Sequence, residues 1–336
     1  MDLLEELKQN PFVLAPMAGI TDRPFRSFMR KYNCGPVITE LVSANGLQYN
    51  SKKTKKLMQF DQIQHPVGIQ IFGERLDALA DAAKYVEELG ADFVDLNFGC
   101  PVKKVVSKGA GSAVLKDMQQ LINVLRAVKA AVNIPVTIKV RTGWDANSKN
   151  SIDVAKIAYD EGITWMGIHG RTRAQGYSGQ ADWEYIKAVK ENSKIPILGN
   201  GDITSAKIAV QRMQESGCDG VMIGRGCLKN PWIFRESLNL WRGENLDVER
   251  NYSKLFDEMK LEFFNFHDER VASLQLKKFA AWYSAGYPGA AKFRKTLFQS
   301  KSTSDLVDSI SEYFFELDHI PQADTSAEPF LMGGHG

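Results

Sequence analysis

The chain has 336 residues, of which 44% are hydrophobic and 24% are charged. This balance excludes a disordered or fibrous protein, because it provides ample apolar surface for a core. The 42 basic and 40 acidic residues give a net charge of +2, so any affinity for nucleic acid has to come from a local cluster of charge.

Eight short apolar segments are predicted to be β-strands, and most are apolar on both faces, as in a covered parallel sheet. In chain order they are Phe12–Ala15, Val37–Leu41, Val67–Ile71, Phe93–Leu96, Val136–Val140, Trp165–Ile168, Ile195–Leu198 and Gly220–Ile223. Amphipathic helical patterns lie between most of them, for example at Asp77–Leu89, Met118–Val132 and Ile152–Glu161. This alternation predicts an α/β fold, the (β/α)8 TIM barrel. An open doubly wound sheet is the alternative, but no G-x-G-x-x-G turn follows the first strand.

After Trp232 the alternation stops and only helices are predicted. They are expected at Tyr252–His267, Arg270–Ala285, Pro288–Ser300 and Ser304–Asp318. The polar stretch 241–247 has the composition of a linker. We therefore expect a barrel at residues 1–240, an all-helical C-terminal domain at 241–320 and a disordered tail at 321–336.

The four cysteines are widely spaced and form no C-x-x-C pair, so neither a disulfide framework nor a metal site is expected. The acidic N-terminus does not resemble a signal peptide, and no apolar run is long enough to cross a bilayer. These features favour a cytoplasmic protein with no membrane partner. A monomer is compatible with the sequence, and the oligomeric state stays open.

Polar tails follow seven of the predicted strands, and barrel enzymes carry their chemistry at this end of the strands. The tails are Pro16-Met17-Ala18-Gly19, Gln70, Asn97-Phe98-Gly99-Cys100, Lys139-Val140-Arg141, His169-Gly170-Arg171, Asn200-Gly201-Asp202 and Gly224-Arg225. Any one of these residues could be polar simply because strand ends meet water. Seven such tails together indicate a functional rim.

The tails after the seventh and eighth strands predict a phosphate site, because glycine-rich turns expose backbone N–H groups and Arg225 can bind phosphate oxygens. The alternative is that their glycines only make tight turns. Asp202 is also placed to cap the following helix.

Lys139 and Arg141 alternate on one strand and therefore face the same side of it. A lysine in that position needs an anion or a polarised acceptor, such as the N1–C2=O edge of a flavin, and the amide of Gln70 suits a flavin edge as well. Cys100 lies between Gly99 and a proline on a basic loop that resembles a lid. Its thiol, with an ordinary pKa near 8.5, is predicted to be a proton donor.

Taken together, these stretches resemble the tRNA-dihydrouridine synthase family, most closely its bacterial B-type branch. The matching motifs are Ala15-Pro16-Met17-Ala18-Gly19-Ile20-Thr21-Asp22-Arg23-Pro24-Phe25-Arg26, Asp95-Leu96-Asn97-Phe98-Gly99-Cys100-Pro101, Lys139-Val140-Arg141-Thr142-Gly143-Trp144, Ile168-His169-Gly170-Arg171-Thr172-Arg173, Gly199-Asn200-Gly201-Asp202-Ile203, and Ile223-Gly224-Arg225-Gly226 with Asn230-Pro231-Trp232-Ile233-Phe234.

The resemblance implies an FMN-dependent oxidoreductase that uses NADPH to reduce the C5=C6 bond of uridines in tRNA. It implies hydride transfer from flavin N5 to C6 and a proton from Cys100 to C5. The implied flavin contacts are Pro16, Met17, Ala18, Gln70 and Lys139, with the phosphate at Asn200, Gly201, Asp202, Gly224 and Arg225. We also assign His169 to the cofactor site, and Asn97, Arg141 and Arg171 to substrate binding.

A surface for tRNA is predicted in residues 270–301, which contain seven basic residues and no acidic residue. Lys292, Arg294 and Lys295 are its expected substrate contacts. One alternative function is a flavin barrel that acts on a small pyrimidine or enone, similar to dihydroorotate dehydrogenases, although such an enzyme needs no basic helical region. Another is a non-catalytic RNA-binding factor, which would need neither Lys139 nor Cys100.

Overall fold

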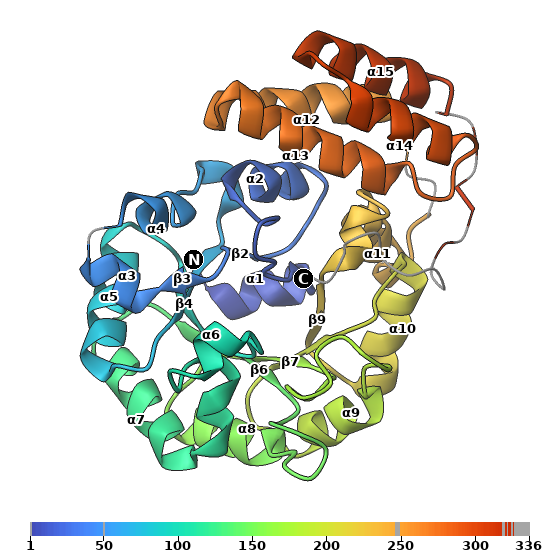
Figure 1. Cartoon of the computed structure of the whole chain (residues 1–336). Helices are drawn as coiled ribbons and strands as arrows, with labels where there is room; N and C mark the ends of the chain where they lie inside the picture. The colour runs from blue at the N-terminus through green and yellow to red at the C-terminus, as the bar shows by residue number, and fades with distance from the viewer. Residues whose placement is uncertain are drawn as a thin grey trace.

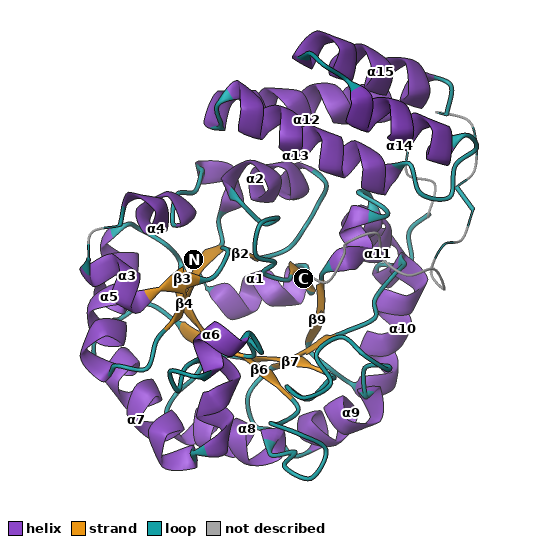
Figure 2. Cartoon of the chain, in the orientation of Figure 1, coloured by secondary structure: helices purple, strands orange, loops and turns teal. Residues whose placement is uncertain are grey.

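The computed structural model describes residues 2–49, 51–245, 249–317, 320, 322, 323 and 325. Strands form a ring at the centre of the larger part of the molecule and helices surround them, as Figure 1 shows along the axis of the ring. The helices that follow residue 251 lie together against one side of this ring (Figures 1 and 2).

The strands form one parallel barrel. They are β1 (Phe12–Leu14), β2 (Val37–Ile38), β3 (Val42–Ser43), β4 (Val67–Phe72), β5 (Phe93–Phe98), β6 (Val136–Arg141), β7 (Met166–His169), β8 (Ile197–Asn200) and β9 (Gly220–Ile223). β1 pairs with both β2 and β9, β2 pairs with β4, and β4 to β9 pair in sequence. The ring therefore closes, which confirms the predicted (β/α)8 barrel and excludes the open sheet.

The segment predicted as a single strand, Val37–Leu41, is interrupted. β2 ends at Ile38, and the chain pairs with β4 again only at β3. Between them the Thr39 hydroxyl donates to the Glu40 carbonyl at 3.0 Å and accepts from the Gln70 N–H at 3.0 Å. The side chain thus takes over a position in the hydrogen-bond ladder, which bends the strand at the rim.

Most of the helices before residue 242 cover the outside of the barrel, and the predicted bounds agree with the observed ones to within a few residues. They are α1 (Leu3–Gln9), α2 (Arg23–Lys31), α3 (Ala44–Gln48), α4 (Lys52–Leu57), α5 (Leu76–Glu88), α6 (Lys103–Val106), α7 (Met118–Lys129), α8 (Ser151–Asp160), α9 (Trp183–Glu191), α10 (Ala206–Ser216) and α11 (Ile233–Trp241), with 3₁₀ turns η1 (Gln62–Gln64), η2 (Gly111–Lys116) and η3 (Arg225–Leu228).

The inside of the barrel is apolar at the N-terminal ends of the strands. Leu3 and Leu7 of α1 join a cluster with Phe93 and Trp165, whose rings lie 5.2 Å apart. Gly68 provides the space, because a Cβ atom there would lie 2.1 Å from the Phe93 ring. Figure 1 shows α1 across the centre of the ring, so it closes this end and leaves the opposite end for the site.

The C-terminal helices are α12 (Tyr252–Phe266), α13 (Glu269–Tyr283), α14 (Ala290–Gln299) and α15 (Thr303–Phe315). They pack on α2, where Phe279 stacks on Phe25 with ring centroids 4.8 Å apart. His267 Nε2 also lies 2.8 Å from the Asp22 carboxylate. The domain bounds at residues 240 and 320 stay predictions, and part of the expected linker, residues 246–248, lies outside the described residues.

The predicted tail, residues 321–336, also lies mostly outside the described residues. Its described residues contact the protein. Gln322 Nε2 donates to the carbonyls of Ala285 at 2.7 Å and Lys229 at 3.1 Å, and the Ala323 N–H donates to Gly286 at 3.0 Å. In the described part of the chain no helix is long and apolar enough to cross a membrane.

Candidate active site

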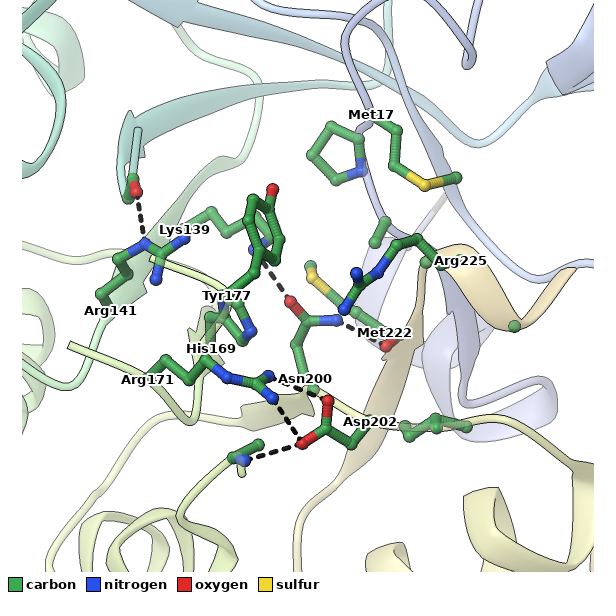
Figure 3. A pocket seen from close by; sticks show the side chains of 18 of the residues that line it. Met17, Lys139, Arg141, His169, Arg171, Tyr177, Asn200, Asp202, Met222 and Arg225 are labelled. Atoms are coloured by element: carbon green, nitrogen blue, oxygen red, sulfur yellow. Dashed lines mark hydrogen bonds and ion pairs between the residues drawn. The ribbon is translucent and has the colours of Figure 1, made fainter. Parts of the chain in front are cut away.

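A cavity of about 740 Å³ opens at the C-terminal ends of the strands (Figure 3). It brings together the residues that the strand ends predicted for cofactor, catalysis and substrate, whereas the three predicted substrate contacts on α14 lie outside it. The predicted residues that line it are Pro16, Met17, Ala18, Gln70, Asn97, Cys100, Lys139, Arg141, His169, Arg171, Asn200, Gly201, Asp202, Gly224 and Arg225.

Strand geometry explains this convergence. In parallel register, Asn97 pairs with Lys139, Arg141 with His169, and His169 with Asn200. Side chains that are paired on neighbouring strands point to the same face of the sheet, and so do side chains two residues apart on one strand. These residues therefore meet at the same rim.

The backbone around Cys100 is held on several sides. The N–H groups of Gly99 and Cys100 donate to Asn97 Oδ1 at 3.2 and 2.9 Å. Arg141 Nε donates to the Gly99 carbonyl at 2.8 Å, and Ser112 Oγ donates to the Cys100 carbonyl at 2.8 Å. The backbone that carries the thiol is therefore fixed at the rim.

Burial raises the pKa of the Cys100 thiol. A hydrogen bond from the Val102 N–H and the positive charge of Arg141 act in the opposite direction, but they are weaker than the burial. The sulfur thus carries its proton at neutral pH, which is the state a proton donor requires.

Lys139 Nζ donates to Asn200 Oδ1 at 3.1 Å, and Asn200 Nδ2 donates to the Met222 carbonyl at 2.8 Å. Burial lowers the pKa of Lys139 to about 8, helped by Arg141 and opposed by Asp95. The amine is therefore mostly charged at neutral pH, and it can donate a hydrogen bond to an electron-rich group of a ligand in the pocket.

The pKa of His169 lies well below its ordinary value because the ring is buried, and because Arg141, Lys139, Arg171 and Arg225 are close. The imidazole is therefore neutral at physiological pH. A neutral ring can donate one hydrogen bond to a ligand without adding charge.

The turns after β8 and β9 allow close approach to the backbone. Gly201 has φ +131°, and a Cβ atom there would lie 2.6 Å from Ala181. Asp202 accepts from the Ala181 N–H at 2.7 Å and from Arg171 Nη2 at 2.9 Å. The idea that Asp202 caps the next helix was wrong, because Ser205 is the residue that caps α10.

Two predicted substrate residues already have partners within the protein. Arg141 Nη1 donates to the carbonyls of Thr172 and Gly176, at 3.0 and 2.8 Å. Arg171 donates to the Gly179 carbonyl at 2.6 Å, and its buried Nη1 makes no hydrogen bond although it lies 2.9 Å from Asp202. Both side chains hold the loop that follows β7, and their contact with substrate stays a prediction.

Tyr177, on the loop that follows β7, was not predicted to belong to the site. Its ring centroid lies 4.9 Å from Arg225 Cζ, 5.7 Å from Arg141 Cζ and 6.2 Å from the His169 ring (Figure 3). The sequence signal was an aromatic residue between Gly176 and Gly179 on a loop after a barrel strand.

The pocket is strongly positive. Of the described residues that line it, six are basic and one, Asp202, is acidic. The donor set comprises cations, glycine turns and side-chain amides. It fits a ligand with an anionic group at the Gly201–Gly224 end and a polar ring edge at the Gln70–Lys139 end.

Lys292, Arg294 and Lys295 lie on α14, outside this pocket. Lys292 and Lys295 are exposed, whereas Arg294 donates to Ser284 Oγ at 3.2 Å. Their role in binding substrate stays a prediction. Among the described residues there is no group of three His, Cys, Asp or Glu side chains that could hold a metal ion.

The closed barrel and its rim pocket define a (β/α)8-barrel enzyme. Over 75% of the chain, this fold matches the structure of histamine dehydrogenase from Rhizobium sp. 4-9, with a TM-score of 0.51 and 14% identity over 49% of that chain. Residues 13–317 match the family model described as dihydrouridine synthase. The chain belongs to the dihydrouridine synthase family, which confirms the predicted family.

Two curated relatives agree with this family. "tRNA-dihydrouridine synthase B" of Pseudomonas aeruginosa is 40% identical over 310 residues, covering 91% of this chain and 93% of the relative. "Probable tRNA-dihydrouridine synthase" of Rickettsia conorii is 37% identical over 323 residues, covering 92% and 94%. The first of these names agrees with the predicted branch.

Proposed function

We propose that this chain is an FMN-dependent tRNA-dihydrouridine synthase that reduces the C5=C6 bond of uridines in tRNA, with NADPH as the reductant. The observation that carries the proposal is a cationic pocket at the barrel rim that is lined by both the Cys100 thiol and Lys139. Family membership and the names of the relatives support tRNA as the substrate.

The residues present fit FMN. The glycine turns, Asn200 and Arg225 would hold the phosphate, and Lys139 and Gln70 would bind the polar edge of the ring. When bound, the flavin supplies the hydride for uracil C6. The protein contributes placement of the two reactants and the field around them.

Cys100 would protonate uracil C5 from the face opposite the ring. Charge that develops at the uracil O4 during the reaction would be stabilised by the positive charge of Arg141 and by a hydrogen bond from the neutral His169 ring, both of which line the pocket. Because the Gly99 and Cys100 N–H groups donate to Asn97, the backbone that carries the thiol would not have to be repositioned during the reaction.

The helical layer would hold the tRNA backbone while a uridine leaves its stack and enters the pocket. Lys292 and Lys295 present exposed charge on α14, which suits phosphate contacts. Reversal of both charges to Glu is expected to abolish binding of tRNA and to leave FMN binding unchanged. Retention of salt-dependent affinity would exclude this surface.

The central test compares Cys100→Ala with Cys218→Ala, a control that removes a buried thiol elsewhere in the barrel. Both variants are expected to bind FMN, which is visible as the yellow flavin absorbance. Only Cys100→Ala should lose dihydrouridine formation in tRNA, measured by mass spectrometry of digested tRNA; an enzyme that lacks a general acid is expected to be slower by roughly 10²- to 10⁴-fold. A colourless wild-type protein that takes up no FMN would disprove the proposal, as would equal turnover of free uridine and tRNA.

A further inference from the structure

A chain of hydrogen bonds runs from a buried carboxylate, Asp95, to the backbone of Cys100. Gln70 Nε2 donates to Asp95 Oδ2 at 2.6 Å, and Asn97 Nδ2 donates to Gln70 Oε1 at 2.8 Å. Asn97 Oδ1 then accepts from the N–H groups of Cys100 and Gly99. Asp95 is fully buried and does not line the pocket, so it lies beneath the floor, two residues before Asn97 on β5.

The donor and acceptor roles at both ends of this series of hydrogen bonds are fixed. An ionised carboxylate can only accept, and a backbone N–H can only donate. Between them, Gln70 and Asn97 each have one oxygen and one NH2 group, so only one orientation of each amide satisfies every contact. If one amide turned over, two donors or two acceptors would face each other, and the mismatch would pass along the chain.

We propose that Asp95 is a positioning residue for Cys100. Its carboxylate orients the Gln70 amide, the Gln70 amide orients Asn97, and Asn97 holds the peptide N–H groups at Gly99 and Cys100. The carboxylate thereby also fixes which atoms of Gln70 remain for a ligand in the pocket. The catalytic meaning of this role rests on the proposed function, in which Cys100 is the proton donor.

The contact with Thr137 shows whether the hydrogen-bond series needs an acceptor oxygen or a negative charge at residue 95. Its hydroxyl donates to Asp95 Oδ1 at 2.6 Å, and a hydroxyl can accept as well as donate. In Asp95→Asn, the new amide nitrogen can face Thr137 while the oxygen still accepts from Gln70. Asp95→Leu has a similar shape but offers no acceptor. Positioning therefore requires an oxygen at residue 95, not a negative charge.

The first experiment measures alkylation of Cys100 by iodoacetamide in the wild type, Asp95→Asn and Asp95→Leu, with and without FMN. The other three cysteines, Cys34, Cys218 and Cys227, are buried, so the reaction reports on Cys100. The rate for the Asn variant is expected to stay within about twofold of the wild type, whereas the Leu variant should differ by about fivefold or more, since rates respond strongly to small misplacements.

In the same variants, oxidation of the reduced enzyme by tRNA should slow by roughly tenfold or more in Asp95→Leu, while reduction by NADPH changes much less. A Leu variant with wild-type alkylation and oxidation rates would overturn the proposal. So would an Asn variant as impaired as the Leu variant, because charge rather than amide orientation would then be the cause.

A second experiment reverses the donor-to-acceptor direction of the hydrogen bonds between residues 95, 70 and 97. In Asn97→Asp, Gln70 has a carboxylate on each side and can donate to only one of them without turning its oxygen toward the other. Adding Asp95→Asn lets Gln70 donate to residue 97 and accept from residue 95. Hydrogen exchange at the Gly99 and Cys100 amides is therefore expected to be faster in Asn97→Asp than in the wild type, and slower again in the double variant.

Purely additive effects of the two substitutions on exchange would overturn the proposal. This measurement needs neither tRNA nor turnover. If the protein does not reduce uridine, the proposed function fails while the exchange result still decides whether Asp95 positions the Cys100 loop.

Discussion

Replacement of Asp95 by Asn is expected to stabilise the protein at alkaline pH. Burial raises the pKa of Asp95 to about 6, an effect that hydrogen bonds from Gln70 and Thr137 and the charge of Lys139 only partly offset. An acid whose pKa is higher in the folded than in the unfolded state binds its proton more tightly when folded. The free energy of unfolding therefore falls as the pH rises from about 4 to about 6, and the whole loss persists above that range.

The magnitude follows from the two pKa values. Between the ordinary value of 3.8 and about 6, at 1.36 kcal/mol for each pH unit, ionised Asp95 lowers the free energy of unfolding by about 3 kcal/mol. The Asp95→Asn variant would have no such loss and would keep the contacts of residue 95 with Gln70 and Thr137. The opposing attraction between Asp95 and Lys139 is already contained in the pKa of about 6, so the expected gain is about 3 kcal/mol.

The assay is denaturant unfolding of the FMN-free proteins at pH 4, 6 and 9, with the exposed Asp160→Asn as the control. The Asp95→Asn variant should unfold at a higher denaturant concentration than the wild type at pH 9 and at nearly the same concentration at pH 4. A difference that does not change with pH, or a less stable variant at pH 9, would refute the reasoning.

Three further outcomes follow from the site. Gly167→Ala would place a Cβ atom 2.8 Å from Met222 Cε, and because Met222 lines the pocket, its displacement should lower FMN affinity, measured by fluorescence titration, by about tenfold. FMN affinity should also weaken above pH 8, as Lys139 loses its proton, and should stay level up to pH 9 in Lys139→Arg. Gly226→Ala, with a Cβ atom 2.3 Å from the Ile203 carbonyl, should lower the free energy of unfolding by about 2 kcal/mol, measured by denaturant unfolding.

The position of the site was predictable from the sequence because barrel geometry leaves little freedom. The apolar segments locate the strands, and the residues that follow them must meet at one rim. Gln70, Lys139 and Asn200 come from three different strands, yet they line one cavity for this reason. Likewise, alternation along β6 was enough to place Lys139 and Arg141 on the same side.

The partners of the polar groups were not predictable, because they depend on how the loops fold over the rim. Arg141 was expected to bind substrate, yet it donates to the carbonyls of Gly99, Thr172 and Gly176, and the sequence does not encode where a loop carbonyl will point. Tyr177 was missed because it reaches the site only through the folding of the loop that follows β7. Asp95 left a signal, since it alternates with Asn97 on β5, but only the structure shows that Gln70 joins them.

The charges around Cys100 connect the pocket to its proposed chemistry. A cluster of cations ordinarily lowers a thiol pKa and favours the thiolate, which cannot donate a proton. Here burial outweighs Arg141, whose guanidinium is turned toward the Gly99 and Thr172 carbonyls. An anionic ligand in the pocket would offset the cations and raise the thiol pKa further. Binding of the cofactor and of the tRNA backbone would therefore hold the proton on Cys100 more firmly, until the charge that develops on the uracil draws it away.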